Sequence, residues 1–145
     1  MELPAFLWPA TVLVVSALAV WRGGPDERLS AGGLLAGWAF TMAVYRTGFR
    51  ETEWGIFAVD AALLALLCWI ALRSPRYWPL LAAGFHLLAV VTHLAKSVDR
   101  QVGAWAYITA EIIWGYLLAL TIGYAAWTAP RQLALANADA AATRR

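Results

Sequence analysis

Five long apolar stretches, separated by short polar segments, dominate the pattern of hydrophobic and polar positions along the chain. Residues 3–21, 29–45 and 77–95 contain no Asp, Glu, Lys or Arg, and residues 54–72 and 101–130 contain one acid each, Asp60 and Glu111. A helix needs roughly 17 to 25 apolar residues to cross ~30 Å of hydrocarbon. The pattern predicts an all-α integral membrane bundle of five transmembrane helices, at about residues 4–21, 29–45, 54–72, 77–96 and 104–128.

Composition supports this interpretation. Of 145 residues, 62% are hydrophobic and 14% are charged, whereas soluble domains are about half apolar and a quarter charged. The alternative, a soluble helical bundle, would need a larger core than a domain of this size encloses. No period-2 alternation of a membrane barrel is visible. We therefore expect one transmembrane helical domain over residues 1–129 and a polar C-terminal tail over residues 130–145.

The first apolar stretch has one feature of a signal peptide, because Ala17-Leu18-Ala19 is similar to a cleavage site. A signal peptide also begins with a basic segment, and Glu2 is the only charged side chain before this stretch. We therefore expect residues 4–21 to be retained as a membrane anchor.

The loop charges predict the orientation. Five crossings place residues 22–28, 73–76 and the tail on one side with seven Lys and Arg, and the N-terminus, residues 46–53 and residues 96–100 on the other side with four. Cytoplasmic loops carry the excess of Lys and Arg. The C-terminus is therefore expected in the cytoplasm and the N-terminus in the periplasm. Most of the nine tryptophans lie near the ends of the stretches, as interfacial aromatic belts do.

Small residues recur in the second and fifth stretches. Gly33 and Gly37 form a G-x-x-x-G pair, and Gly115, Ala119 and Gly123 form a second ridge. Small residues let two membrane helices approach closely. Packing within one chain is the favoured use of these residues, and a seam between two copies is the alternative.

The ionisable residues inside the apolar stretches share one half of the predicted membrane. With a rise of about 1.5 Å per residue, Asp60, Glu111 and His86 lie ~9, ~10 and ~13 Å from the same surface. An intramembrane carboxylate costs a few kcal/mol unless it is paired, protonated or hydrated. We expect these three residues to form a polar cluster inside the bundle, acting either as a functional site or as hydrogen-bonded glue between helices.

His93 lies only ~3 Å below that surface, beside Lys96, so we expect it to meet solvent or lipid headgroups. A quinone or headgroup pocket needs a histidine or an acid near aromatic walls. The residues that could line such a pocket are Trp114, Tyr107, Phe85 and His93. Trp38 and Trp114 lie near mid-membrane, where they either pack between helices or line a ligand site.

Several other chemistries are not supported. His86 and His93 lie two helical turns apart on one face, which excludes their ligating one haem iron from opposite sides within one subunit. The sequence requires no cofactor, and no metal site is predicted, because no ligands show the spacing of one; Asp60, His86 and Glu111 could still form a carboxylate-rich site. No hydrolase or phosphate-loop motif is present, so no catalytic residue is expected. The net charge of +2 is spread over the loops, which does not support nucleic-acid binding.

One resemblance covers most of the last three predicted helices. The runs ETEWGIFAVDAALLALLCWIALRSPRYWPLLAAGFHLLAVVTHLAKSVD and AYITAEIIWGYLLALTIG resemble a group of small multi-pass bacterial inner-membrane proteins without an assigned activity. The resemblance implies a bacterial inner membrane and transfers no functional residues.

Three functions follow as hypotheses. The favoured one is a non-enzymatic accessory or assembly subunit of a larger inner-membrane complex, because the chain is small and nearly all of it is expected to lie in the membrane. The first alternative is a proton-, quinone- or pigment-handling electron-transfer protein that uses the His/Asp/Glu cluster. The second alternative is a small oligomeric transporter or channel. The expected partners are the lipid bilayer and either other membrane subunits or further copies of the chain.

Overall fold

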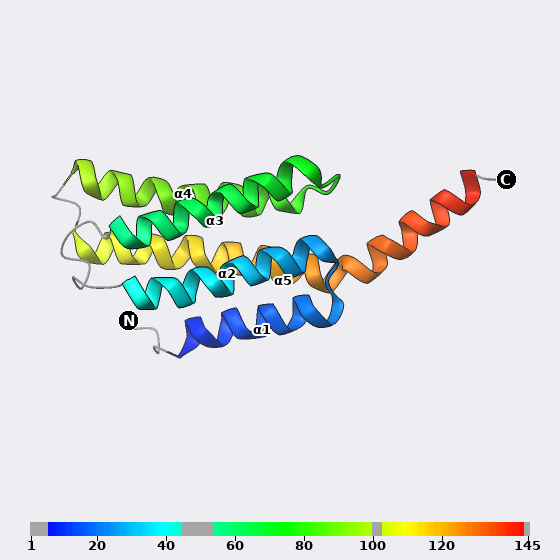
Figure 1. The fold of residues 1–145 in the computed structure, drawn as a ribbon, viewed down its shortest axis with the longest axis horizontal. Helices are drawn as coiled ribbons and strands as arrows, with labels where there is room; N and C mark the ends of the chain where they lie inside the picture. Colours follow the sequence, from blue (N-terminus) through cyan, green and yellow to red (C-terminus); the bar gives the residue numbers. More distant parts are fainter. Residues whose placement is uncertain (1–5, 45–53, 100–102, 144–145) are drawn as a thin grey trace.

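The computed structural model describes residues 6–44, 54–99 and 103–143 (Figure 1). Within these residues the chain is all-helical, as predicted, with no strand. The helices are α1 (Leu7–Arg22), α2 (Pro25–Val44), α3 (Trp54–Arg73), α4 (Trp78–Val98) and α5 (Ala104–Thr143). Three segments, α3, α4 and Ala104–Arg131 of α5, are long and apolar enough to cross a membrane. The protein is therefore an integral membrane protein.

Helix α2 begins four residues earlier than predicted. Only Gly23 and Gly24 separate it from α1, so most of the polar segment at residues 22–28 is helical. Pro25 suits the first helical position because its missing N–H would have no helical partner, and Asp26 and Glu27 face the positive end of the helix dipole. A Cβ atom at Gly23 would lie 2.5 Å from the Ala19 carbonyl oxygen, so this tight connection requires glycine.

Helix α5 also differs from the prediction, which ended it at residue 128. The helix continues through Pro130 to Thr143 and projects beyond the bundle (Figure 1). Proline lacks a backbone N–H and crowds the preceding turn, so it bends a helix without always ending it. The segment predicted as a polar tail is therefore helical up to Thr143.

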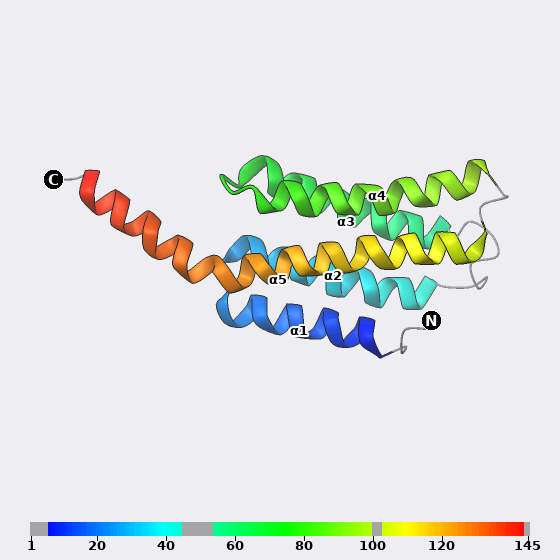
Figure 2. The same cartoon turned by 180° about the vertical axis from the view of Figure 1, so that it is seen from behind.

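The helices pack around a central space. Helix α5 contacts α1, α2 and α4, and the remaining neighbours are consecutive helices; Figure 2 shows α5 running between α1 and α4. Helices α2, α3, α4 and α5 thus form a ring of four. Among the described residues, neither diagonal pair of this ring, α2 with α4 or α3 with α5, is in contact. The centre of the ring is therefore left to side chains and a cavity.

The small-residue ridges lie against helices of the same chain. Cβ atoms built at Gly33 would meet Leu66 of α3, and those at Gly115 and Gly123 would meet Trp8 and Val15 of α1. Gly37 also faces α3, at ordinary contact distance, and Ala119 is fully buried. The outer surface is covered by large exposed apolar side chains, which suits helices that face lipid.

A buried ion pair closes the end of the bundle where α1 joins α2 and α3 joins α4. The Glu27 side chain is 0% exposed, accepts the Gly24 backbone N–H at 2.9 Å and pairs with Arg76 Nη1. Arg76 Nη2 also lies 3.2 Å from Asp26 Oδ2. These contacts attach the first turn of α2 to the α3–α4 connection, which is far away in sequence.

Replacing Glu27 with Gln should lower the free energy of unfolding by about 2 kcal/mol, because it leaves Arg76 without its buried partner. Asp26→Asn removes the more exposed partner of the same arginine and should cost less than about 1 kcal/mol. Unfolding in detergent micelles by added denaturant measures both values. Equal losses would contradict the central role of Glu27.

Candidate functional site

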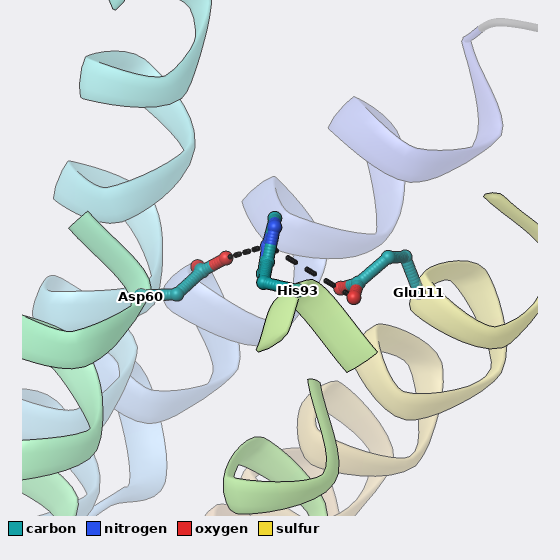
Figure 3. A group of neighbouring side chains, drawn as sticks. All are labelled: Asp60, His93 and Glu111. Carbon is teal, nitrogen blue, oxygen red and sulfur yellow. Dashed lines mark hydrogen bonds and ion pairs between the residues drawn. The ribbon is translucent and has the colours of Figure 1, made fainter. Parts of the chain in front are cut away.

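Three polar side chains meet inside the four-helix ring: Asp60 from α3, His93 from α4 and Glu111 from α5 (Figure 3). His93 lies between the two acids, with its Nε2 atom 2.8 Å from Asp60 Oδ2 and 3.9 Å from Glu111 Oε1. One potential ligand atom from each residue lies within 4.8 Å of the other two. We call these three residues the triad.

The antiparallel course of the helices brings the triad to one level. Asp60 lies six residues after the start of α3, His93 five before the end of α4, and Glu111 seven after the start of α5. At a rise of 1.5 Å per residue, each is roughly 8 to 10 Å from the same end of the bundle. The depths predicted for the two acids from their sequence positions thus agree with the level at which the triad lies in the bundle.

His93 is buried, and the expectation that it meets solvent or headgroups is wrong. The residue is 2% exposed, and its Nδ1 atom lies 2.7 Å from the Tyr107 hydroxyl. Its ring also packs edge-on against Phe57. Counting residues from the end of a stretch measures depth alone, whereas the direction of the side chain around the helix axis decides burial. On α4 that direction points His93 toward α3 and α5.

His86 lies beside the triad and contacts one of the two acids expected as its partners, chiefly through the backbone of that residue. Its Nε2 atom is 3.0 Å from the backbone carbonyl oxygen of Asp60 and 3.8 Å from the Asp60 carboxylate. A carbonyl oxygen only accepts hydrogen bonds, so Nε2 carries the proton and donates it. His86 therefore holds α4 to the backbone of α3, and of the two acids it is Asp60 that it contacts.

Glu111 is the less compensated acid of the triad. Its Oε1 atom is buried, and no donor in the described part of the chain lies within hydrogen-bond distance of it. Its side chain as a whole is 23% exposed and lines a cavity. The carboxylate oxygen that faces His93 is thus open to a further partner.

A cavity of about 350 Å³ lies next to the triad and receives side chains from all five helices. Of the lining residues expected from the sequence, His93 and Tyr107 lie on its wall. Trp114 instead donates a hydrogen bond from Nε1 to Thr92 Oγ1 at 3.3 Å, and Phe85 is not on the wall. The aromatic walls are Trp8, Trp38 and Tyr116.

Sequence reasoning missed two of these wall residues and only partly anticipated a third. For Trp38, lining a ligand site was one of two expected roles, and packing between helices was the other. No pattern indicated Trp8 or Tyr116, whose rings stack edge to face at 5.3 Å. Gly37 and Gly115 also line the cavity. The small-residue ridges therefore contribute space to the cavity as well as allowing close contacts between helices.

No protein-family description, curated protein or solved structure matches this chain. The resemblance to small bacterial inner-membrane proteins stays a prediction.

Replacing Tyr107 with Phe should free His93 Nδ1 and lower the free energy of unfolding by about 1 kcal/mol, the usual worth of one hydrogen bond. Nitrogen-15 NMR of labelled histidine rings should show a changed Nδ1 signal for one histidine. The control is Tyr124→Phe, because Tyr124 is exposed and its hydroxyl is far along α5. An unchanged Nδ1 signal in Tyr107→Phe would show that this contact does not position the imidazole.

Proposed function

We propose that this protein spans the membrane five times and binds a small, largely apolar molecule with an oxygen-bearing head group, of the quinone class, in the cavity beside the triad. The observation that carries the proposal is the composition of the cavity wall. Ligand sites are typically concave, apolar and aromatic, of roughly 300 to 1,000 Å³, with a few convergent polar groups. The cavity of about 350 Å³ has these properties, with Trp8 and Trp38 on its wall and the triad as its polar part.

The five-span topology is supported by the position of α1 and α2, of which α1 is an apolar helix shorter than the three candidate spans. Helix α1 has 16 residues, and α2 has 20 residues with its charges in the first turn. Both pack lengthwise in the bundle beside α5. Trp21, Trp69 and Trp127 are exposed near one end, and Trp54 and Trp105 near the other, as rings at two membrane interfaces would be.

The orientation proposed from the loop charges puts the C-terminus in the cytoplasm, in a bacterial inner membrane. A fluorescent protein fused after Arg145 should then fluoresce, since it would be on the cytoplasmic side. Alkaline phosphatase should be inactive when fused after Gly24 and active when fused after Gly48. Equal phosphatase activity at the last two sites would exclude a crossing by α2.

A quinone-type head group fits this site better than a wholly apolar molecule does. Its carbonyl oxygens are acceptors, which a protonated histidine or carboxylic acid can satisfy. Trp8 and Trp38 offer flat apolar faces for a ring. The triad lies roughly 8 to 10 Å from one end of the bundle. A ring with a hydrocarbon tail that is dissolved in the membrane can reach this depth by lateral diffusion.

The accessory-subunit and transporter hypotheses, and the exchange of protons at the triad, stay predictions. No contact among the described residues favours one of these hypotheses over another. A binding site for an apolar ligand is compatible with an accessory subunit, because such a subunit can hold a ligand for its neighbours.

Filling the cavity should weaken ligand binding. Gly37 lines the cavity, whereas the space around a Cβ at Gly32 of the same helix is open. Gly37→Leu should weaken binding of a short-tailed quinone at least tenfold, measured by quenching of tryptophan fluorescence. Gly32→Leu should leave the affinity within a factor of two.

The thermal stability of both variants has to be measured as well, because Gly37 also approaches Leu63. If Gly37→Leu is unstable, Ile108→Phe fills the same cavity from α5. Wild-type protein that shows no saturable quenching, or fillers that leave the quenching unchanged, would overturn the proposed function.

A further inference from the structure

We infer that Asp60, His93 and Glu111 form a mononuclear site for a divalent first-row transition metal ion, such as Zn²⁺, Mn²⁺ or Fe²⁺. The three residues come from three different helices and bring one nitrogen and two carboxylate oxygens within 4.8 Å of one another, with His93 between the two acids (Figure 3). Imidazole together with carboxylates is a donor set that these ions use, with three protein ligands in many sites. Mg²⁺ and Ca²⁺ prefer oxygen ligands alone, so His93 favours a transition metal.

The distances need only local adjustment. With metal–ligand bonds of about 2.1 Å, a tetrahedral ion holds its ligand atoms about 3.4 Å apart. Asp60 Oδ2 and His93 Nε2 are 2.8 Å apart, and His93 Nε2 and Glu111 Oε1 are 3.9 Å apart. The first pair would open and the second would close by about half an ångström each. Glu111 has a long side chain that borders the cavity, so it can supply the closing movement toward His93 and toward Asp60, whose ligand atoms lie within 4.8 Å of its own.

The neighbours of the triad are arranged as in metal sites. A metal-binding histidine usually gives the N–H of its other nitrogen to an oxygen, which orients the ring. The Tyr107 hydroxyl, 2.7 Å from His93 Nδ1, can take that hydrogen bond and leave the Nε2 lone pair for the ion. His86 holds the backbone of Asp60 at 3.0 Å and so positions the second ligand.

Charge also favours a cation here. When a divalent ion binds, both carboxylates are ionised, and the ion neutralises their two negative charges. In hydrocarbon such compensation replaces the lost hydration of the acids. The buried Glu111 Oε1 atom, which accepts no hydrogen bond from the described residues, is the oxygen that the ion would satisfy. Lys96 is a nearby cation, and its Nζ lies over the Tyr107 ring, 4.1 Å from the ring centre.

Three protein ligands leave at least one coordination position open. The cavity is the space next to the triad, so that position would be available to an oxygen atom of a molecule bound there. This role of the metal, as the anchor of a head group, rests on the proposed function; the metal site itself does not.

The test uses the full-length protein in detergent, stripped with a chelator and titrated with Zn²⁺ by calorimetry and with Co²⁺ by visible absorption. We expect one ion per chain and Co²⁺ bands typical of nitrogen and oxygen ligands. Asp60→Asn, His93→Gln and Glu111→Gln should each weaken binding at least tenfold. Tyr107→Phe, which keeps all three ligands, should weaken it about tenfold, as loss of a ligand's outer partner does. The matched control, Asp99→Asn, changes an exposed carboxylate and should bind like wild type.

Thermal unfolding with and without Zn²⁺ gives a second readout, since a bound ion stabilises the folded state. Wild type should gain stability, and each triad variant should gain less at the same concentration of Zn²⁺. The inference would be overturned if wild type bound no metal ion. It would also be overturned if each of the three single triad variants bound the ion as tightly as wild type.

Quinone quenching measured on the metal-free protein separates the two proposals. Quenching without metal binding leaves the proposed function standing and removes the metal site. If the protein binds metal but quinone quenches neither the metal-free nor the metal-bound form, the metal site stands and the proposed function is wrong.

Discussion

The hydrogen bond between the His93 imidazole and the Asp60 carboxylate allows two neighbouring helices to carry polar side chains at the depth of the hydrocarbon. An uncompensated charge there costs roughly 3 kcal/mol, a large share of a typical stability. Because His93 is held by Tyr107 on its other side, the compensation links α3, α4 and α5. The level at which these helices meet follows from the need to bring the three side chains together.

The same constraint explains why the ring of four helices is not filled by apolar side chains alone. Helices α3 and α5 are not in contact among the described residues, and the polar side chains of both reach His93 between them. Gly37 of α2 and Gly115 of α5 add no side-chain volume to the wall of the cavity. The polar cluster and these two glycines together leave a cavity that is apolar along most of its surface.

Much of the fold was predictable, because apolar length depends on composition alone. The limits of α3 and α4 agree with the structure to within two residues. The start of α2 was missed because the charged residues 26–28 were interpreted as part of a polar connection. The end of α5 was missed because the apolar stretch ends at Pro130, although the helix continues beyond it. The site was only half predictable. Asp60 and Glu111 were expected inside the bundle, and the seven-residue spacing on one helix face already implied that His93 is buried if His86 is. The rings of Trp8 and Tyr116 depend on how α1 sits against α5, which no local pattern encodes.

The contacts of Asp60 have a consequence for how the chain enters the membrane. Both histidines near Asp60 belong to α4, which follows α3 after a connection of only four residues, Ser74 to Tyr77. A hairpin of two helices can leave the insertion machinery as one unit, so Asp60 can enter the lipid already accompanied by its hydrogen-bond partners. Glu111 enters later, on α5, when Asp60 and the two histidines are already in place. Biogenesis of this protein would thus insert the carboxylate with close hydrogen-bond partners before Glu111, whose Oε1 accepts no hydrogen bond from the described residues.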